Sequence, residues 1–145
     1  MKNEKGFSLV ELLIVLLIIG VIAQLAIPNL LRSRMAGNEG SAINTVRTII
    51  SAEMLYVTTR GGGRYGSLDV LSQGSLLDSV VGSATKDGYT FSISLGPADS
   101  TYNVNARPTN YDSTGQRSFF GDESAVIRYT TANAPATNGS PVLGQ

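Results

Sequence analysis

Glu11 is the residue whose type and setting most clearly predict chemistry. It is the only charged residue in residues 6–31, where the sequence is otherwise almost wholly apolar. An ionised carboxylate at the centre of a membrane helix costs roughly 2.5–3.5 kcal/mol on insertion scales, so it needs a cationic partner. A simpler interpretation places Glu11 at the membrane interface, where its side chain reaches water or is protonated.

Two looser groups of polar residues in the rest of the chain are candidate binding sites. Three acidic residues, Asp112, Asp122 and Glu123, could converge on a loop calcium ion, but their spacing matches no defined calcium loop and a solvated turn explains them more simply. A basic patch for nucleic acid could be built from Arg60, Arg64, Arg107, Arg117, Tyr65 and Tyr111. Eleven basic residues balance eleven acidic ones, so nucleic-acid binding is not supported and an ordinary surface is favoured.

The chain contains neither cysteine nor histidine. Disulfides, thiolate ligands and the side chains most often used as general bases and transition-metal ligands are therefore excluded. No pair of carboxylates is marked out by its spacing for acid–base catalysis. We therefore expect no enzyme, no cofactor and no metal site.

A long apolar segment carries Glu11. Residues 12–23 are apolar without exception, and the segment extends from Phe7 to Ile27 with only three polar interruptions. That length of helix spans a bilayer, so we predict a transmembrane helix over residues 7–27. An ordinary secretory signal is disfavoured because the apolar run is too long and contains an acid.

Gly20 and Pro28 are the two positions at which this helix is expected to be weak. Pro28 has no N–H to donate to the carbonyl of Gln24, and its ring crowds that turn. Gly20 costs about 1 kcal/mol relative to alanine. The two residues predict a flexible segment, although both are also tolerated in ordinary membrane helices.

The remaining sequence predicts an α+β head. An amphipathic pattern continues the helix over residues 28–59, although Gly37 and Gly40 weaken that prediction. A globular head with three to four antiparallel strands is predicted over residues 60–131, and a loosely ordered tail over residues 132–145. The expected strands are 89–95, 102–106, 118–120 and 125–131, and a short helix is expected at 68–73 with Ser67 as its N-cap.

The residues Gly6-Phe7-Ser8-Leu9-Val10-Glu11-Leu12-Leu13 resemble the prepilin signal of type IV pilins and type II secretion pseudopilins. The resemblance includes the short basic leader, the apolar run and Pro28. It implies the pilin fold, cleavage of a leader at residues 1–6 between Gly6 and Phe7, and methylation of the new Phe7 amine. That amine would supply a cation for Glu11, either in the same subunit, since residues four apart share a helix face, or in a neighbouring one during assembly.

The resemblance also implies the partners and the location. The partners would be a prepilin peptidase and methyltransferase, an inner-membrane assembly platform with its ATPase, the lipid bilayer before assembly, and further copies of the chain in a helical filament. Lys2 and Lys5 precede the helix while Arg32 and Arg34 follow it, so charge does not decide orientation. The family pattern places the N-terminus in the cytoplasm, with a single span in the inner membrane before assembly.

Three functions remain open at this point. A type IV pilin would build an extracellular pilus, whereas a pseudopilin would build a periplasmic filament for type II secretion. A single-pass anchored binding domain that never polymerises is an alternative of another class.

Overall fold

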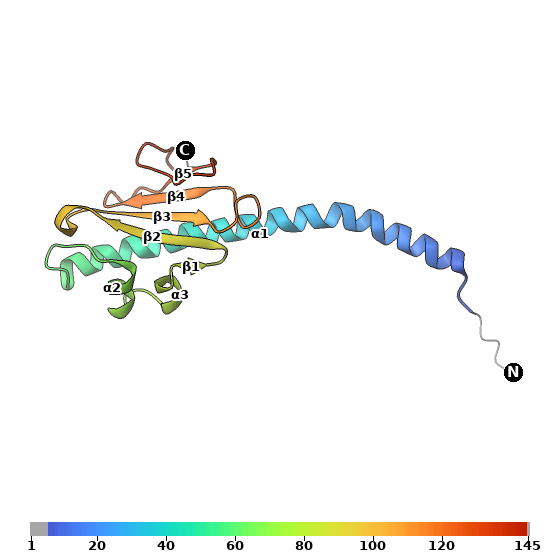
Figure 1. Ribbon diagram of the computed structural model, residues 1–145, viewed down its shortest axis with the longest axis horizontal. Coiled ribbons are helices and arrows are strands. Elements are labelled where there is room, and N and C mark those ends of the chain that lie inside the picture. Colours follow the sequence, from blue (N-terminus) through green and yellow to red (C-terminus); the bar gives the residue numbers. More distant parts are fainter. Residues whose placement is uncertain (1–5, 145) are drawn as a thin grey trace. The chain divides into compact units, whose positions relative to one another are not determined.

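The computed structural model describes residues 6–144 (Figure 1). These residues fall into two compact units that divide between Arg34 and Met35. Helix α1, Leu9–Thr59, contributes residues to both units. The fold is the α+β pilin-like architecture that the sequence predicts.

Helix α1 continues without interruption through every residue that was expected to weaken it. Gly20, Pro28, Gly37 and Gly40 all lie within this one continuous α-helix. The side chain of Asn29, next to the proline, donates a hydrogen bond to the carbonyl of Leu25 at 3.0 Å. In the second unit, the helix buries one stripe of side chains that includes Ala42, Val46, Ile49 and Ile50, so tertiary packing there offsets the low helix propensity of the two glycines.

The sheet has five strands, whereas the sequence predicts three to four. The strands are β1 (Thr85–Lys86), β2 (Tyr89–Leu95), β3 (Tyr102–Pro108), β4 (Ser118–Asp122) and β5 (Arg128–Thr130). They lie in sequence order, and each pairs antiparallel with the next. The additional strand is β1, which is too short to show an alternating pattern of its own.

Alternation along β2 and β3 divides the sheet into two faces. Tyr89, Phe91, Val104 and Ala106 are buried in the core that the sheet shares with α1. The alternate residues of the two strands lie on the opposite face, where Thr90 is the register partner of Arg107. The sheet therefore has an apolar inner face and a polar outer face, as alternation predicts.

Short helices close the space between α1 and the sheet. Helix α2, Leu68–Gln73, matches the predicted bounds, and the Ser67 side chain accepts a hydrogen bond from the N–H of Val70. Helix α3, Ser79–Gly82, and the 3-10 helix η1, Pro97–Asp99, were not predicted. Asp78 caps α3 by accepting from the N–H of Val81, which is the role that N-cap aspartates commonly play.

The segment after β5 makes defined contacts with the head. The N–H of Tyr129 donates to Pro141, and that of Leu143 donates to Ile127. Ala136 is buried. Part of this segment therefore contacts the head, while loose ordering of residues 132–145 remains a prediction; Gln145 lies outside the described residues.

Candidate functional site

The peptide bond between Gly6 and Phe7 lies in non-helical, exposed chain. Residues 6–8 have no regular secondary structure, and 84% of the Phe7 surface is exposed. Helix α1 begins two residues later, at Leu9. This peptide bond is therefore exposed and lies outside regular secondary structure. The rest of the expected leader, residues 1–5 with Lys2 and Lys5, lies outside the described residues.

Ser8 and Glu11 together form the start of α1. Glu11 Oε2 accepts a hydrogen bond from the N–H of Ser8 at 2.9 Å, and Ser8 Oγ accepts one from the N–H of Val10 at 3.3 Å. A serine at the N-cap and a glutamate three residues later are the two members of a capping box, in which the glutamate reaches back to the N-cap N–H. The Ser-x-x-Glu spacing of Ser8 and Glu11 is the sequence signal from which this cap can be predicted.

The position of Glu11 has a direct consequence for the cleavage hypothesis. In the uncleaved chain, the nitrogen of Phe7 is a peptide nitrogen and carries no charge. The Glu11 carboxylate bonds instead to the next residue along, Ser8. It also lies in the first turn of α1, where a negative charge interacts favourably with the helix dipole. Glu11 therefore already has a partner one residue from the expected new amine.

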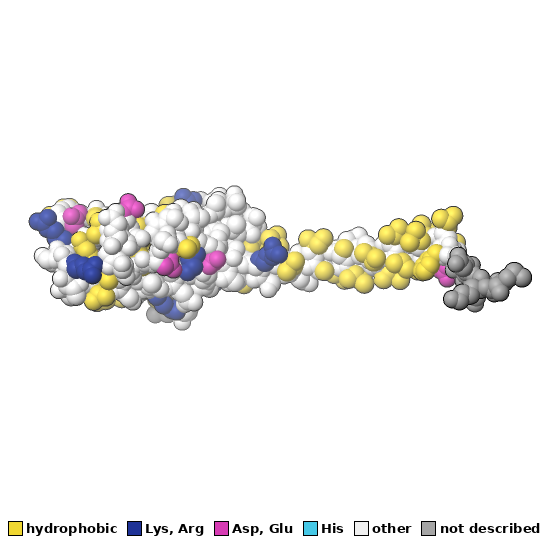
Figure 2. Space-filling model, turned by 90° about the horizontal axis from the view of Figure 1, so that it is seen from below, with side chains coloured by type: hydrophobic (Ala, Val, Ile, Leu, Met, Phe, Trp, Pro, Cys, Tyr) yellow, Lys and Arg dark blue, Asp and Glu magenta, His cyan; other side chains and the backbone are white. Residues whose placement is uncertain are grey.

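The helix surface that follows Glu11 is apolar and uncovered. Large hydrophobic side chains between Leu9 and Leu31 are exposed, and Figure 2 shows those on one face in yellow. Within the described residues, α1 is the one helix that is long and apolar enough to cross a membrane. Exposed apolar surface of this extent is unstable in water and marks a contact with lipid or with protein.

A small apolar hollow lies beside Pro28. It has a volume of about 240 Å³ and is lined by Ile27, Leu30, Leu31 and Arg34. Gly20, the other residue expected to confer flexibility, has open space around the position where a Cβ would be. Both positions are in regular helix, so their proposed flexibility remains a prediction.

The three acidic residues considered for calcium do not form a cluster. Asp112 accepts from the side-chain amide of Gln116, while Asp122 accepts from the N–H and hydroxyl of Ser124. Among the residues described, no group of three acidic side chains is arranged to hold a metal ion.

The arginines considered for nucleic acid are also separated by their contacts. Arg60 donates to the carbonyl of Gly74, and Arg117 forms an ion pair with Glu39 at 2.7 Å. Arg107 and Tyr111 do come together, in a pocket on the outer face of the sheet. Arg60, Arg107 and Arg117 therefore have separate surroundings in the head.

Two buried carboxylates were missed by sequence reasoning. Glu39 accepts from the backbone N–H groups of Gln116 and Arg117 as well as from the Arg117 guanidinium, and so ties α1 to the loop before β4. Glu53 is fully buried, and its Oε2 accepts from the N–H of Gly66 at 2.9 Å. Burial raises the pKa of Glu53 to about 7, although the Gly66 bond lowers it. Both bonds join α1 to segments distant in the sequence, so local pattern does not show that these two glutamates are buried.

The N-terminus of the chain is similar to a known protein family. Residues 1–23 match the family model described as the prokaryotic N-terminal methylation motif. The chain carries a prepilin-type N-terminus. The prepilin-type match thus includes Gly6, Phe7 and Glu11 and ends before Pro28.

Pilus and secretion proteins are similar to the chain over longer segments. It is 54% identical over 39 residues to the type IV wide pilus major component PilA4 of Thermus thermophilus, covering 27% of the chain and 30% of that relative. It is 26% identical over 107 residues to the type II secretion system core protein G of Escherichia coli, covering 69% and 70%. The core protein G of Pectobacterium carotovorum is 32% identical over 54 residues, covering 37% and 35%.

The alignments with PilA4 and with the Pectobacterium protein thus span about a third of those relatives. No solved structure matches the chain significantly. Together, the prepilin-type N-terminus, its relatives and the α+β architecture support a structural subunit of the pilin or pseudopilin kind.

Proposed function

We propose that this chain is the precursor of a type IV pilin that polymerises through its N-terminal helix. The observation that carries the proposal is the exposed apolar surface of α1, which follows directly on an accessible Gly6–Phe7 peptide bond within a methylation motif. Lipid covers this surface before assembly, and other copies of the same helix cover it afterwards. Residues 7–27 therefore serve first as a membrane anchor and then as the filament core.

Cleavage and assembly are linked through Glu11. A prepilin peptidase removes residues 1–6 at the cytoplasmic face, and methylation of the Phe7 amine follows. The amine carries a positive charge, and it lies one residue from Ser8, whose backbone N–H donates to the Glu11 carboxylate in the uncleaved chain. A charged pair in an apolar environment is strongly favoured over either charge alone. An incoming subunit's amine that reaches Glu11 of a neighbour therefore fixes the stagger between subunits.

The remaining partners follow from this role. An inner-membrane platform with an assembly ATPase would extract the subunit from the bilayer, in which it has a single span and a cytoplasmic N-terminus. Gly20 and Pro28 would allow the packed helix to stretch. Residues 28–59 would continue the helix into a head formed by residues 60–131.

A pseudopilin is the second candidate. The alignment that covers most of the chain, 107 residues, is with a type II secretion core protein G. In that case the filament would be a short periplasmic one. Gene neighbours distinguish the two: a retraction ATPase favours the pilus, and a secretin-linked export cluster favours the pseudopilus.

The assembly role of Glu11 can be tested with two substitutions. We expect Glu11→Ala to be processed and inserted normally but to form no filaments, because the counter-charge for the Phe7 amine is lost. Glu11→Gln retains an acceptor for the Ser8 N–H but has no charge. It should also form no filaments, which would show that assembly depends on the charge and not on helix capping. Electron microscopy of sheared cell-surface fractions measures filaments, and mass spectrometry measures processing.

Glu123→Ala is the matched control, because Glu123 is exposed in the head. It should assemble as the unsubstituted chain does. Normal filaments from both Glu11 variants would remove the proposed role of this residue.

A further inference from the structure

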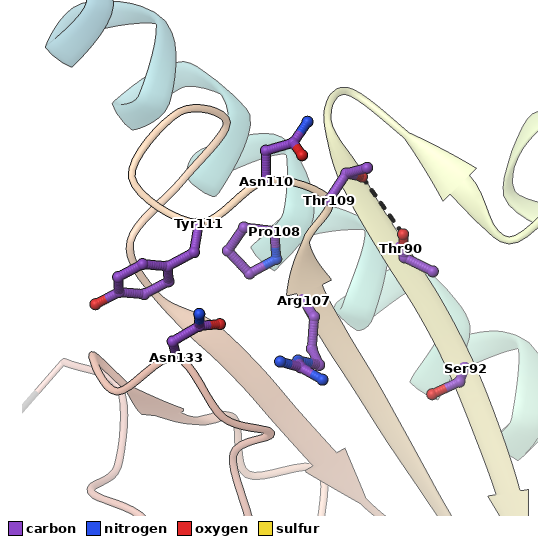
Figure 3. A pocket seen from close by; sticks show the side chains of 8 residues that line it. All are labelled: Thr90, Ser92, Arg107, Pro108, Thr109, Asn110, Tyr111 and Asn133. Atoms are coloured by element: carbon purple, nitrogen blue, oxygen red, sulfur yellow. Dashed lines mark hydrogen bonds between the residues drawn. The ribbon is translucent and has the colours of Figure 1, made fainter.

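A polar pocket opens on the outer face of the sheet, away from the core. Its volume is about 480 Å³, within the range of small-molecule sites. The eight side chains that line it are shown in Figure 3: Thr90, Ser92, Arg107, Pro108, Thr109, Asn110, Tyr111 and Asn133. None of the functions proposed above uses this pocket.

Three separate segments build the pocket. Strands β2 and β3 supply its floor, where the register pairs Thr90 with Arg107. The loop after β3 supplies Tyr111, whose hydroxyl donates to the carbonyl of Thr131 and so fastens the loop to the segment after β5. That segment brings Asn133 to the wall beside the tyrosine ring (Figure 3). The pocket is therefore a product of the tertiary fold, and the hydrogen bond from Tyr111 to Thr131 joins two of its segments.

The lining has one cation and no acid. Arg107 is exposed, and among residues 6–144 no hydrogen bond or ion pair to its guanidinium is formed. The nearest acid in the loop, Asp112, accepts instead from the side chain of Gln116. An unpaired guanidinium with five donors in a planar fork matches a carboxylate or a similar planar anion.

The other side chains suit a ligand rich in hydroxyl groups. Three hydroxyl residues and two amides offer both donors and acceptors, and Thr90 and Thr109 lie within 3.4 Å of one another through their Oγ1 atoms. The rings of Tyr111 and Pro108 add flat apolar surface beside these polar groups (Figure 3). An apolar ligand would leave the polar side chains without hydrogen-bond partners. A bare inorganic anion would make no contact with the two rings and could not bond to all of the polar side chains.

We propose that this pocket binds the carboxylated ring of an acidic saccharide, with Arg107 on the carboxylate, the Asn and Thr side chains on the hydroxyl groups, and Tyr111 against the ring face. The inference does not depend on polymerisation. A chain that never assembles would still bind the sugar.

The test uses the full chain in detergent micelles and a trimer of α-1,4-linked galacturonate. We expect saturable binding by isothermal titration calorimetry. The neutral trimer of α-1,4-linked galactose should bind at least tenfold more weakly, because it lacks the carboxylate. Arg107→Gln should weaken galacturonate binding by at least tenfold, and Tyr111→Leu should weaken binding of both sugars.

Arg64→Gln is the matched control, since Arg64 is exposed and lies outside the pocket. This variant should bind as the unsubstituted chain does. An equal loss in Arg64→Gln would indicate attraction to general positive charge and would overturn the proposal. Absence of saturable binding, equal binding of the neutral trimer, or full displacement by an equal concentration of inorganic phosphate would overturn it as well.

Discussion

Glu53 is a carboxylic acid inside the core of the head. Its side chain has no exposed surface, Oε2 accepts from Gly66, and Oε1 has no partner among the described residues. The raised pKa of about 7, against 4.5 for an ordinary glutamate, follows first from burial. The folded head therefore binds more protons than the unfolded chain between these two pH values.

The sign of the resulting pH dependence follows from linkage. Because the folded-state pKa is the higher one, the contribution to stability is fully present below about pH 4.5 and is lost as the pH rises through 7. A difference of about 2.5 pKa units corresponds to about 3 kcal/mol at most. The head should therefore lose stability between pH 5 and pH 8.

We expect Glu53→Gln to remove this part of the pH dependence, because glutamine retains an acceptor for the Gly66 N–H and does not ionise. Its free energy of unfolding should exceed that of the unsubstituted chain at pH 8 and approach it at pH 5. Urea unfolding of the full chain in micelles, followed by tyrosine fluorescence at several pH values, measures the difference. Parallel curves for the two proteins would show that Glu53 is already ionised in the fold.

At the scale of elements, the contact between β4 and α1 depends on a residue without a side chain. A Cβ at Gly121 would lie 2.8 Å from Cδ1 of Ile50 and 3.2 Å from Cγ1 of Val46. Both of those side chains are buried in the helix stripe. The strand can approach the helix this closely because position 121 is glycine.

Gly121→Ala should therefore destabilise the head by about 1–3 kcal/mol, the usual cost of overpacking a core. Ile50→Val removes the methyl group that the new Cβ would meet. The alanine substitution should consequently cost less in the Ile50→Val background, and a double-mutant cycle by urea unfolding measures this coupling. Additive effects would mean that the strand moves away from the helix as a whole.

The elements differ in how well the sequence predicts them, for physical reasons. Strand β2 alternates over seven residues and was predicted with the right bounds, and the Ser67 cap of α2 was predicted from local chemistry. Strand β1 and helix α3 are too short to show a periodic sequence pattern. Whether they form depends on the elements they pack against. Strand β5 is shorter than the expected 125–131 because its pairing with β4 is confined to the three pairs from Phe120–Arg128 to Ser118–Thr130.

The candidate sites show the same division. The spacing of Gly6, Phe7 and Glu11 is local, so the sequence alone identifies it. The Glu39–Arg117 ion pair joins residues 78 positions apart, and the pocket at Arg107 needs three segments to meet. Such sites depend on the tertiary fold and could not be derived from local pattern.

At the scale of the whole molecule, we propose that the N-terminal segment links cleavage to assembly. In this proposal, cleavage and assembly would use the same residues: the leader would keep the Phe7 nitrogen neutral, and its removal would create the charge that Glu11 of a neighbouring subunit receives in the filament. A chain that retains its leader should therefore stay in the membrane, whatever its head binds.

Mass spectrometry of the N-terminal peptide tests this claim most directly, on material from sheared filaments and on material extracted from the inner membrane of cells that lack the prepilin peptidase. We expect the filament chain to begin at Phe7 and to carry one added methyl group on its amine. We expect the membrane chain from the peptidase-deficient cells to begin ahead of Gly6 and to form no filaments. Filaments whose subunits still begin ahead of Gly6 would contradict this claim.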